Sequence, residues 1–303
     1  MINHNPYLKP DSVTVCTVEG LLYFIWEREH VRLLKEKGFN APWTDDEVIS
    51  KYKFTNIHRK DDKVSKWVIK EIINPNLKDK DLWFSLLITR LINWPPTLGR
   101  LLDENIIPCG PENFDGASFS KTIEDYKKES PKVYSGAYMV YPTKLGNGGN
   151  KSESLAKYII GDTVKAANEI REALQSNKIE NFVTELAGCF GISTFMAGQV
   201  AADLTYAKGH FGEAEDLYTY APLGPGSQRG LNYLLNRAPT AAWPQEDFNK
   251  RLMEVNEFVQ EDLRITDLTL HDVQNIMCEY SKYCRFVTGD GVPKTLYRPE
   301  TEF

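Results

Sequence analysis

The stretch that decides the fold is Glu185–Tyr206, ELAGCFGISTFMAGQVAADLTY. Its apolar residues recur at helical spacing, and Gly188 and Gly191 mark a tight turn within it. We interpret it as a helix end, a hairpin and a second helix that starts near Ser193, which is the layout of a helix-hairpin-helix. Such a hairpin points backbone N–H groups at a phosphate, and glycine allows the close approach. The alternative is an ordinary turn between two helices with a glycine C-cap.

Outward from this hairpin, helical spacing dominates and strand-like alternation is scarce, so we predict an all-α fold. The chain has 303 residues, enough for one helical unit spanning 1–303 or for two lobes, about 1–140 and about 151–290. Residues 108–150 contain turns and the GNGG run at 146–149, and we expect a loop at 143–152 that either closes over a substrate or lies disordered on the surface. The expected helices cover residues 20–37, 54–73, 81–94, 118–128, 152–176, 179–187, 194–206, 228–236, 245–260 and 270–286.

Composition excludes several classes of protein. The formal net charge of −6 does not favour nucleic-acid binding unless the basic side chains are segregated. The five cysteines are scattered and form no CxxC pair, which argues against a metal site or a disulfide framework. We expect no cofactor. The sequence contains no long apolar run and no signal-peptide core, so we expect no membrane span and a cytoplasmic location.

Phe54–Ile69, FTNIHRKDDKVSKWVI, is the first stretch with candidate chemistry. On the expected helix, Arg59 and Asp62 lie three residues apart, with Asn56 nearby. The arginine could hold phosphate oxygens while the carboxylate takes a proton. The alternative is a solvated ion pair that contributes only a few tenths of a kcal/mol.

Gly224–Arg237, GPGSQRGLNYLLNR, is the second such stretch. We expect Ser227 to cap a helix that begins at Gln228, with exposed N–H groups beside Arg229. These groups would form an anion site able to hold a phosphate or pyrophosphate. The alternative is a capped helix start with a surface arginine.

Cys278–Arg285, CEYSKYCR, is the third stretch. Glu279 and Lys282 can pair at i,i+3, and the two tyrosines either stack on bases or pack in the core. His58 and His271 stand apart from any metal-ligand spacing or nucleophile motif. We therefore expect both histidines to be surface or structural residues.

Taken together and in this order, these stretches resemble one known family. It comprises the alpha-glutamyl/putrescinyl-thymine pyrophosphorylase-like proteins, also called amino acid:DNA transferases, and the helical domain of phage 5-hydroxymethyluracil DNA kinases. The resemblance runs from about residue 21 to residue 285. The residues that carry it are Pro42-Trp43-Thr44 with Asp46, Phe54-Thr55-Asn56 with Arg59 and Asp62, Gly191 with Gln199, Asp203-Leu204 and Tyr206, Gly224 to Ser227 with Arg229 to Asn232, and Cys278-Glu279-Tyr280 with Lys282-Tyr283.

The resemblance implies a fold related to helix-hairpin-helix DNA glycosylases and a role in thymine hypermodification in phage DNA. In that pathway a kinase yields a pyrophosphorylated 5-hydroxymethyluracil, and a glycosylase-like enzyme replaces the pyrophosphate with an amine, such as an amino acid or polyamine. The enzyme must flip the base, hold the pyrophosphate and present a neutral amine. DNA and the amine are thus the implied partners.

The family pattern supplies positions, and we infer a role for each residue from its chemistry. Arg59 and Arg229 would bind pyrophosphate with Ser227 and the turn from Gly224 to Gly226, while Asp62 would deprotonate the amine. Asn56 would position the base, and Asp203 would be either a second acid/base or a buried structural acid. The remaining expected binding residues are Gly188, Gly191, Asn232 and Lys282.

The sequence departs from the glycosylase pattern in one respect. The position at which a helix-hairpin-helix glycosylase carries its catalytic aspartate falls in FGEAED, residues 211–216, and none of these acids begins the next helix. Transfer is therefore favoured over N-glycosidic hydrolysis. No GxxxxGK[ST] motif occurs, so the chain is not expected to be the kinase itself. Two alternatives stay open: a non-catalytic DNA-binding module that partners a separate kinase, and a modified-base DNA glycosylase.

Overall fold

The computed structural model describes the chain except for residues 1–4, 109, 137–149, 292–295 and 298–303. The described residues form helices joined by turns and loops, and their strand-like pairing is limited to an isolated bridge between Tyr52 and Leu296. The predicted all-α fold is confirmed. The chain groups into two compact units, Met1–Asp62 with Tyr218–Glu302 and Lys63–Leu217. We call them the outer unit and the inserted unit.

This grouping differs from the two sequential lobes considered from the sequence. The reason lies in the last helix, whose buried face packs on the first helix and so joins the two ends of the chain in one core. The GNGG run and the rest of residues 137–149 lie outside the described residues.

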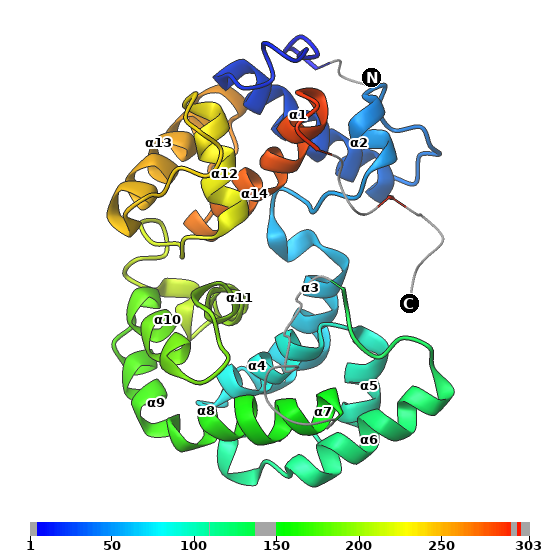
Figure 1. Ribbon diagram of the computed structural model, residues 1–303, viewed down its shortest axis with the longest axis vertical. Helices are drawn as coiled ribbons and strands as arrows, with labels where there is room; N and C mark the ends of the chain where they lie inside the picture. Colours follow the sequence, from blue (N-terminus) through cyan, green and yellow to red (C-terminus); the bar gives the residue numbers. More distant parts are fainter. Residues whose placement is uncertain (1–4, 109, 137–149, 292–295, 298–303) are drawn as a thin grey trace. The chain divides into compact units, whose positions relative to one another are not determined.

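The outer unit is built around one buried helix. Its helices are α1 (Val18–Glu36), α2 (Glu47–Lys51), α12 (Pro225–Leu234), α13 (Gln245–Leu263) and α14 (Leu270–Val287) (Figure 1). Helix α14 begins with a capping box, in which Thr269 and Asp272 exchange side-chain to backbone hydrogen bonds. Its aromatic residues Tyr280 and Tyr283 are fully buried and lie against Phe24 of α1.

Glycines determine how closely α12 approaches α14. A Cβ atom at Gly230 would lie 2.1 Å from the Met277 carbonyl oxygen, and one at Gly226 would lie 2.4 Å from the Cys278 sulfur. Both contacts are far inside van der Waals distance, so only glycine fits at this helix crossing. Packing against α14 therefore accounts for two glycines of the GPGSQRG stretch.

Asp46 anchors the start of α2 in the core of the outer unit. Its side chain accepts hydrogen bonds from the N–H groups of Val48 and Ile49 and from the hydroxyl of Tyr283. Asp46 is thus the N-cap, while Thr44 accepts from its N–H. A buried carboxylate with this many donors is satisfied, and it ties α2 to α14.

The inserted unit contains the remaining helices: α3 (Lys63–Val68), α4 (Leu82–Ile92), α5 (Pro95–Asp103), α6 (Gly116–Glu129), α7 (Lys151–Ser154), α8 (Gly161–Lys165), α9 (Ala167–Gln175), α10 (Ile179–Gly188) and α11 (Thr194–Leu204). Helix α4 is buried along its whole length. It ends at Asn93, which adopts the left-handed conformation, and Pro95 begins α5.

Helices α10 and α11 form the helical hairpin that the sequence predicts (Figure 1). Ser193 caps α11 by accepting from the N–H of Met196. Gly191 has a φ of +76°, and a Cβ atom there would lie 3.0 Å from the Ile159 side chain. A left-handed glycine therefore makes the turn possible.

Residues 54–62 depart from the prediction. The expected helix over 54–73 begins only at Lys63, and the preceding residues form a loop with a single 3₁₀ turn at Arg59–Asp61. Within the loop, the N–H of Asn56 donates to Asp62 Oδ1 at 2.8 Å and its side-chain amide donates to the carbonyl of Asp61 at 2.9 Å. These side-chain bonds compete with helical ones and keep the segment non-helical.

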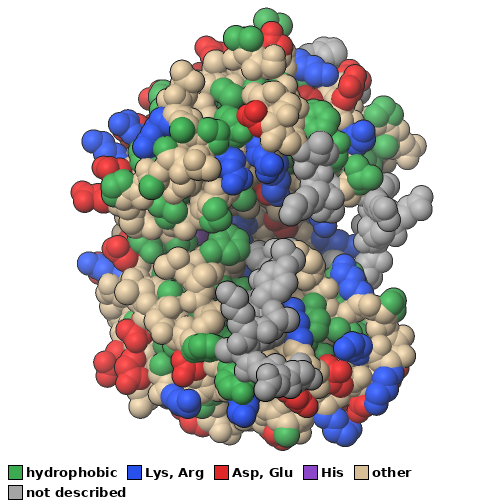
Figure 2. Space-filling view, in the orientation of Figure 1, with side chains coloured by type: hydrophobic (Ala, Val, Ile, Leu, Met, Phe, Trp, Pro, Cys, Tyr) green, Lys and Arg blue, Asp and Glu red, His purple; other side chains and the backbone are tan. Residues whose placement is uncertain are grey.

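On the face shown in Figure 2, basic side chains are scattered among acidic ones. None of the described helices is long and apolar enough to cross a bilayer. Among the described residues, no group of three histidine, cysteine or acidic side chains is placed to hold a metal ion.

Candidate functional site

The candidate site lies in the outer unit, where α14 holds the loop of residues 54–62, which we call the FTN loop. The N–H of Arg59 donates to Asp272 at 2.9 Å, and the N–H of Thr55 donates to Glu279 at 3.1 Å. The Asn275 amide donates to the Thr55 hydroxyl at 2.9 Å. Three side chains of one helix thus fix the backbone of the loop, and they hold its functional side chains in a defined place.

Helix α1 holds the other side of the FTN loop through Arg28. This buried arginine donates to the carbonyls of Phe54 and Thr55 at 3.2 and 3.3 Å. Burial lowers the pKa of Arg28, while Glu279 and Asp62 oppose that effect. The loop therefore brings its carboxylate next to a buried cation.

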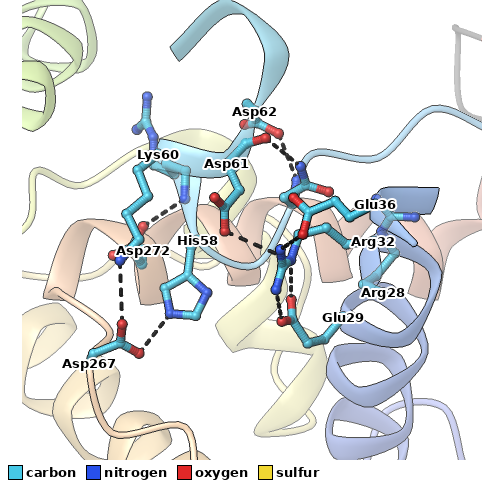
Figure 3. A network of polar contacts seen from close by, with 12 residues as sticks. Arg28, Glu29, Arg32, Glu36, His58, Lys60, Asp61, Asp62, Asp267 and Asp272 are labelled. Atoms are coloured by element: carbon cyan, nitrogen blue, oxygen red, sulfur yellow. Dashed lines mark hydrogen bonds and ion pairs between the residues drawn. The ribbon is translucent and has the colours of Figure 1, made fainter. Parts of the chain in front are cut away.

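Further polar contacts support the FTN loop from outside (Figure 3). Arg32 of α1 pairs with Glu29 and Glu36 of its own helix and lies 3.7 Å from the carboxylate of Asp61. The ring of His58 lies 2.8 Å from Asp267. His58 is also buried, which favours the structural alternative over the surface one.

Asp62 is the carboxylate of the site, and its pKa is raised to about 6. Burial raises it, and the charge of Glu279 adds to this effect. The N–H of Asn56 and the charge of Arg59 lower it, but not enough to offset burial. A carboxyl group with a pKa close to neutrality is ionised at pH 7 and can accept and release a proton.

Cys278 lies within electrostatic range of three cations of the site. Arg59 from the FTN loop, Arg229 from α12 and Lys282 from α14 all act electrostatically on this thiol. Burial nevertheless raises the pKa of Cys278 to about 11, so the thiol is protonated and unsuited to act as a nucleophile at neutral pH. Together the three cations could bind an anion.

Lys282 and Glu279 form the ion pair that the sequence indicates, with 2.5 Å between nitrogen and oxygen. Burial, the largest single effect, would lower the pKa of Lys282, but the charge and hydrogen bond of Glu279 together with Cys278 and Asp62 outweigh it, and the net shift is upward. Lys282 thus stays charged, while two-fifths of its side chain remains exposed. It can contact a ligand without leaving its partner.

Arg229 has no hydrogen-bond or ion-pair partner among the residues that the structure describes. It lies on α12 three residues after Gly226, whose close packing against Cys278 sets the distance between the two helices. A half-buried arginine that no described residue pairs with can offer all five of its N–H donors to an anion.

Ser227 does not cap α12. The helix begins at Pro225 with Gly224 as N-cap, and the buried Ser227 hydroxyl donates to the Gly224 carbonyl at 3.0 Å. The helix starts earlier than the sequence predicts because proline favours the first helical position, and the first turn therefore includes the serine. Asn232 is likewise buried; it donates to the carbonyls of Pro239 and Ala241 and so holds the turn after α12.

The structure thus brings Asn56, Arg59, Asp62, Arg229 and Lys282 together in one unit.

Three expected site residues lie in the inserted unit instead. Asp203 of α11 is fully buried and pairs with Arg90 of α4 through both carboxylate oxygens. This pairing favours the structural alternative for Asp203 over an acid/base role. The hairpin glycines Gly188 and Gly191 also belong to this unit.

The surroundings of the hairpin are acidic. Asp162 accepts the N–H of Phe190 at 2.8 Å, and Asp162, Glu185 and Glu169 help to raise the pKa of Cys189, after burial itself. One of the N–H groups that a phosphate would use is therefore already bound to a carboxylate.

Sequence reasoning missed three side chains that hold the FTN loop: Arg28, Asn275 and Glu279. A usable signal existed in the last helix. His271, Asn275, Cys278 and Lys282 follow one another at steps of four, three and four residues, which places them on one helix face. Polar residues on one face of an otherwise apolar helix indicate a buried polar site.

Comparison with known proteins gives two matches. The family described as "5-hmdU DNA kinase, helical domain" matches residues 16–291. A protein of Bacillus phage SP10 named "5-hmdU DNA kinase" is 28% identical over 228 residues, which cover 69% of this chain and 34% of that protein. The chain thus matches about a third of the length of this curated relative. No solved structure matches.

Proposed function

Since the chain belongs to the family of 5-hmdU DNA kinase helical domains, we propose that it acts in the modification of 5-hydroxymethyluracil in DNA. The specific reaction we propose is transfer. The substrate base carries pyrophosphate on its 5-methylene group, and an amine replaces it. A new C–N bond forms as the C–O bond to pyrophosphate breaks, and the amine gives up one proton.

The observation that carries this proposal is a proton-accepting carboxylate on the same loop as one of the anion-binding cations, Arg59. Asp62, with a pKa of about 6, takes the proton of the amine. Arg59, Arg229 and Lys282, all within electrostatic range of Cys278, stabilise the charge of the departing pyrophosphate. Asn56 is fixed within the FTN loop, because its N–H donates to Asp62 and its side-chain amide donates to the Asp61 carbonyl. In this position it would orient the base beside Asp62 and the cations.

DNA binding and base flipping are part of the same proposal. The ring to which the leaving group is attached must leave the stack for its 5-methylene group to reach Asp62 and the cations. We propose a fold of the DNA-glycosylase-like, helix-hairpin-helix kind, with the α10–α11 turn around Gly188 and Gly191 as a further DNA contact. The acidic neighbours of that turn make it a weaker candidate for phosphate than the cations of the outer unit.

A second candidate is a DNA-binding module that brings a separate kinase to 5-hydroxymethyluracil. The specific observation in its favour is the relative, which is named a kinase and is about three times the length of the matched region. In that case the same cations would bind DNA phosphates and Asp62 would have no proton to accept.

The test is release of pyrophosphate from DNA that carries pyrophosphorylated 5-hydroxymethyluracil, measured with and without amines. Transfer predicts release that depends on the amine and is lost in Arg229→Ala. The matched control is Arg251→Ala on α13, because Arg251 is an exposed arginine paired with Glu254 in the same unit. DNA binding without release would contradict transfer and support the module, and an abasic site would indicate a glycosylase.

A further inference from the structure

His271 is a buried residue that the proposed roles leave unused. Only 2% of its surface is exposed, and neither ring nitrogen has a hydrogen-bond partner among the residues that the structure describes. A neutral imidazole carries one N–H donor and one acceptor, and buried polar groups in folded proteins are nearly always paired. His271 therefore offers a donor and an acceptor that no described residue uses.

The position of His271 connects it to the cation cluster. It lies in the first turn of α14, on the helix face that also carries Asn275, Cys278 and Lys282. Arg59 acts electrostatically on both His271 and Cys278. Its N–H is bound to Asp272, the residue next to His271, so the backbone of the arginine is fixed beside the same helical turn.

Electrostatics keeps this histidine neutral in the absence of a ligand. Burial and, to a smaller extent, the charge of Arg59 together lower the pKa of His271 to about 3. A neutral ring next to an arginine adds a hydrogen-bond donor without adding a second positive charge to be desolvated. An anion that enters the cluster would find that donor already in place.

We propose that His271 donates a ring N–H to a phosphoryl oxygen and, with Arg59, forms the inner end of the anion site. This inference rests on the proposed function, because it extends the same site by one binding residue. The phosphoryl group belongs either to the pyrophosphate on the base or to the DNA backbone. The chemistry that His271 recognises is the same in both.

The experiment measures binding of inorganic pyrophosphate and of unmodified single-stranded DNA to the full chain and to His271→Leu. Leucine removes both ring nitrogens and is apolar, so we expect it to fold with unchanged or higher thermal stability. Loss of a hydrogen bond to a charged ligand predicts binding weakened about tenfold or more. His271→Gln, which restores an amide N–H, should recover part of the affinity. A matched control is His210→Leu in the inserted unit, which should bind normally.

A direct readout separates binding from structure. In ¹⁵N-histidine-labelled protein, the ring signals that disappear in His271→Leu should shift when pyrophosphate is added. Weakened binding of pyrophosphate alone assigns the contact to the leaving group, and weakened binding of DNA alone assigns it to the backbone. Unchanged affinity and unmoved ring signals in a chain that binds pyrophosphate through Arg229 would overturn the role of His271 and leave the proposed function standing. No pyrophosphate binding by the native chain would overturn both.

Discussion

Asp62→Asn removes a carboxylate that is costly to ionise in the folded chain, so this substitution is predicted to stabilise the protein at neutral pH. Asparagine keeps an oxygen to accept the 2.8 Å hydrogen bond from the N–H of Asn56. Below about pH 4 the carboxyl is protonated in both the folded and the unfolded chain. Above its folded pKa of about 6 it is ionised in both. The native chain must ionise a buried group there, whereas the variant does not.

The size of the effect follows from the pKa. A rise from 3.8 to about 6 corresponds to about 3 kcal/mol of stability that the native chain loses as the pH rises through that range. The free energy of unfolding of Asp62→Asn minus that of the native chain should therefore grow by up to about 3 kcal/mol between about pH 4 and pH 7.

Urea unfolding of both proteins at several pH values measures this difference directly, because the contributions of other titrating groups cancel. The amine-dependent release of pyrophosphate should fall in the same variant. A difference that stays constant with pH, or a variant that is less stable at pH 7, would refute the reasoning. Asp62 would then be an ordinary paired carboxylate with no special readiness to accept a proton.

Three other substitutions test separate parts of the structure. Arg229→Ala should leave the thermal midpoint unchanged, since its guanidinium has no partner among the described residues, but should weaken pyrophosphate binding measured by calorimetry. Gly230→Ala should destabilise the chain by several kcal/mol in urea unfolding, because its Cβ would lie 2.1 Å from the Met277 carbonyl oxygen. A loss below about 1 kcal/mol would mean that α12 can shift away from α14 at little cost. Asp203→Asn should cost about 3–5 kcal/mol by leaving the Arg90 charge buried without its partner, and native stability would contradict the structural role.

The sequence predicted the elements whose apolar residues repeat at helical spacing. The α10–α11 hairpin, with its glycine-containing turn, and the long helix α14 lie close to where periodicity placed them. The same reasoning was wrong for residues 54–62, where periodicity is helical but Asn56, Asp61 and Asp62 bond to one another's backbone and side chains. Local side-chain bonds of this kind leave no signature in a pattern of apolar residues.

The site was predicted in part for a similar reason. Local spacing and turn motifs are enough to single out four residues: Arg59, Asp62, Arg229 and Lys282. Arg28 did not, because its role depends on carbonyls 26 and 27 residues away in sequence.

The sequence pattern places Gly226 and Gly230 in an anion-binding turn or a family motif. In the structure, atoms of α14 occupy the space that a Cβ atom at either position would need. The role of Arg28 and the need for glycine on α12 both depend on contacts between segments distant in sequence, which a single sequence does not reveal.

The most direct test of transfer is mass spectrometry of the nucleosides from DNA carrying pyrophosphorylated 5-hydroxymethyluracil, after incubation with the protein and a mixture of amino acids and polyamines. The account predicts a new thymidine that bears an amine on its 5-methylene group, formed by the native chain and by Arg251→Ala but lost in Arg229→Ala and strongly reduced in Asp62→Asn. Nucleosides that stay unchanged while the protein measurably binds the DNA would contradict it.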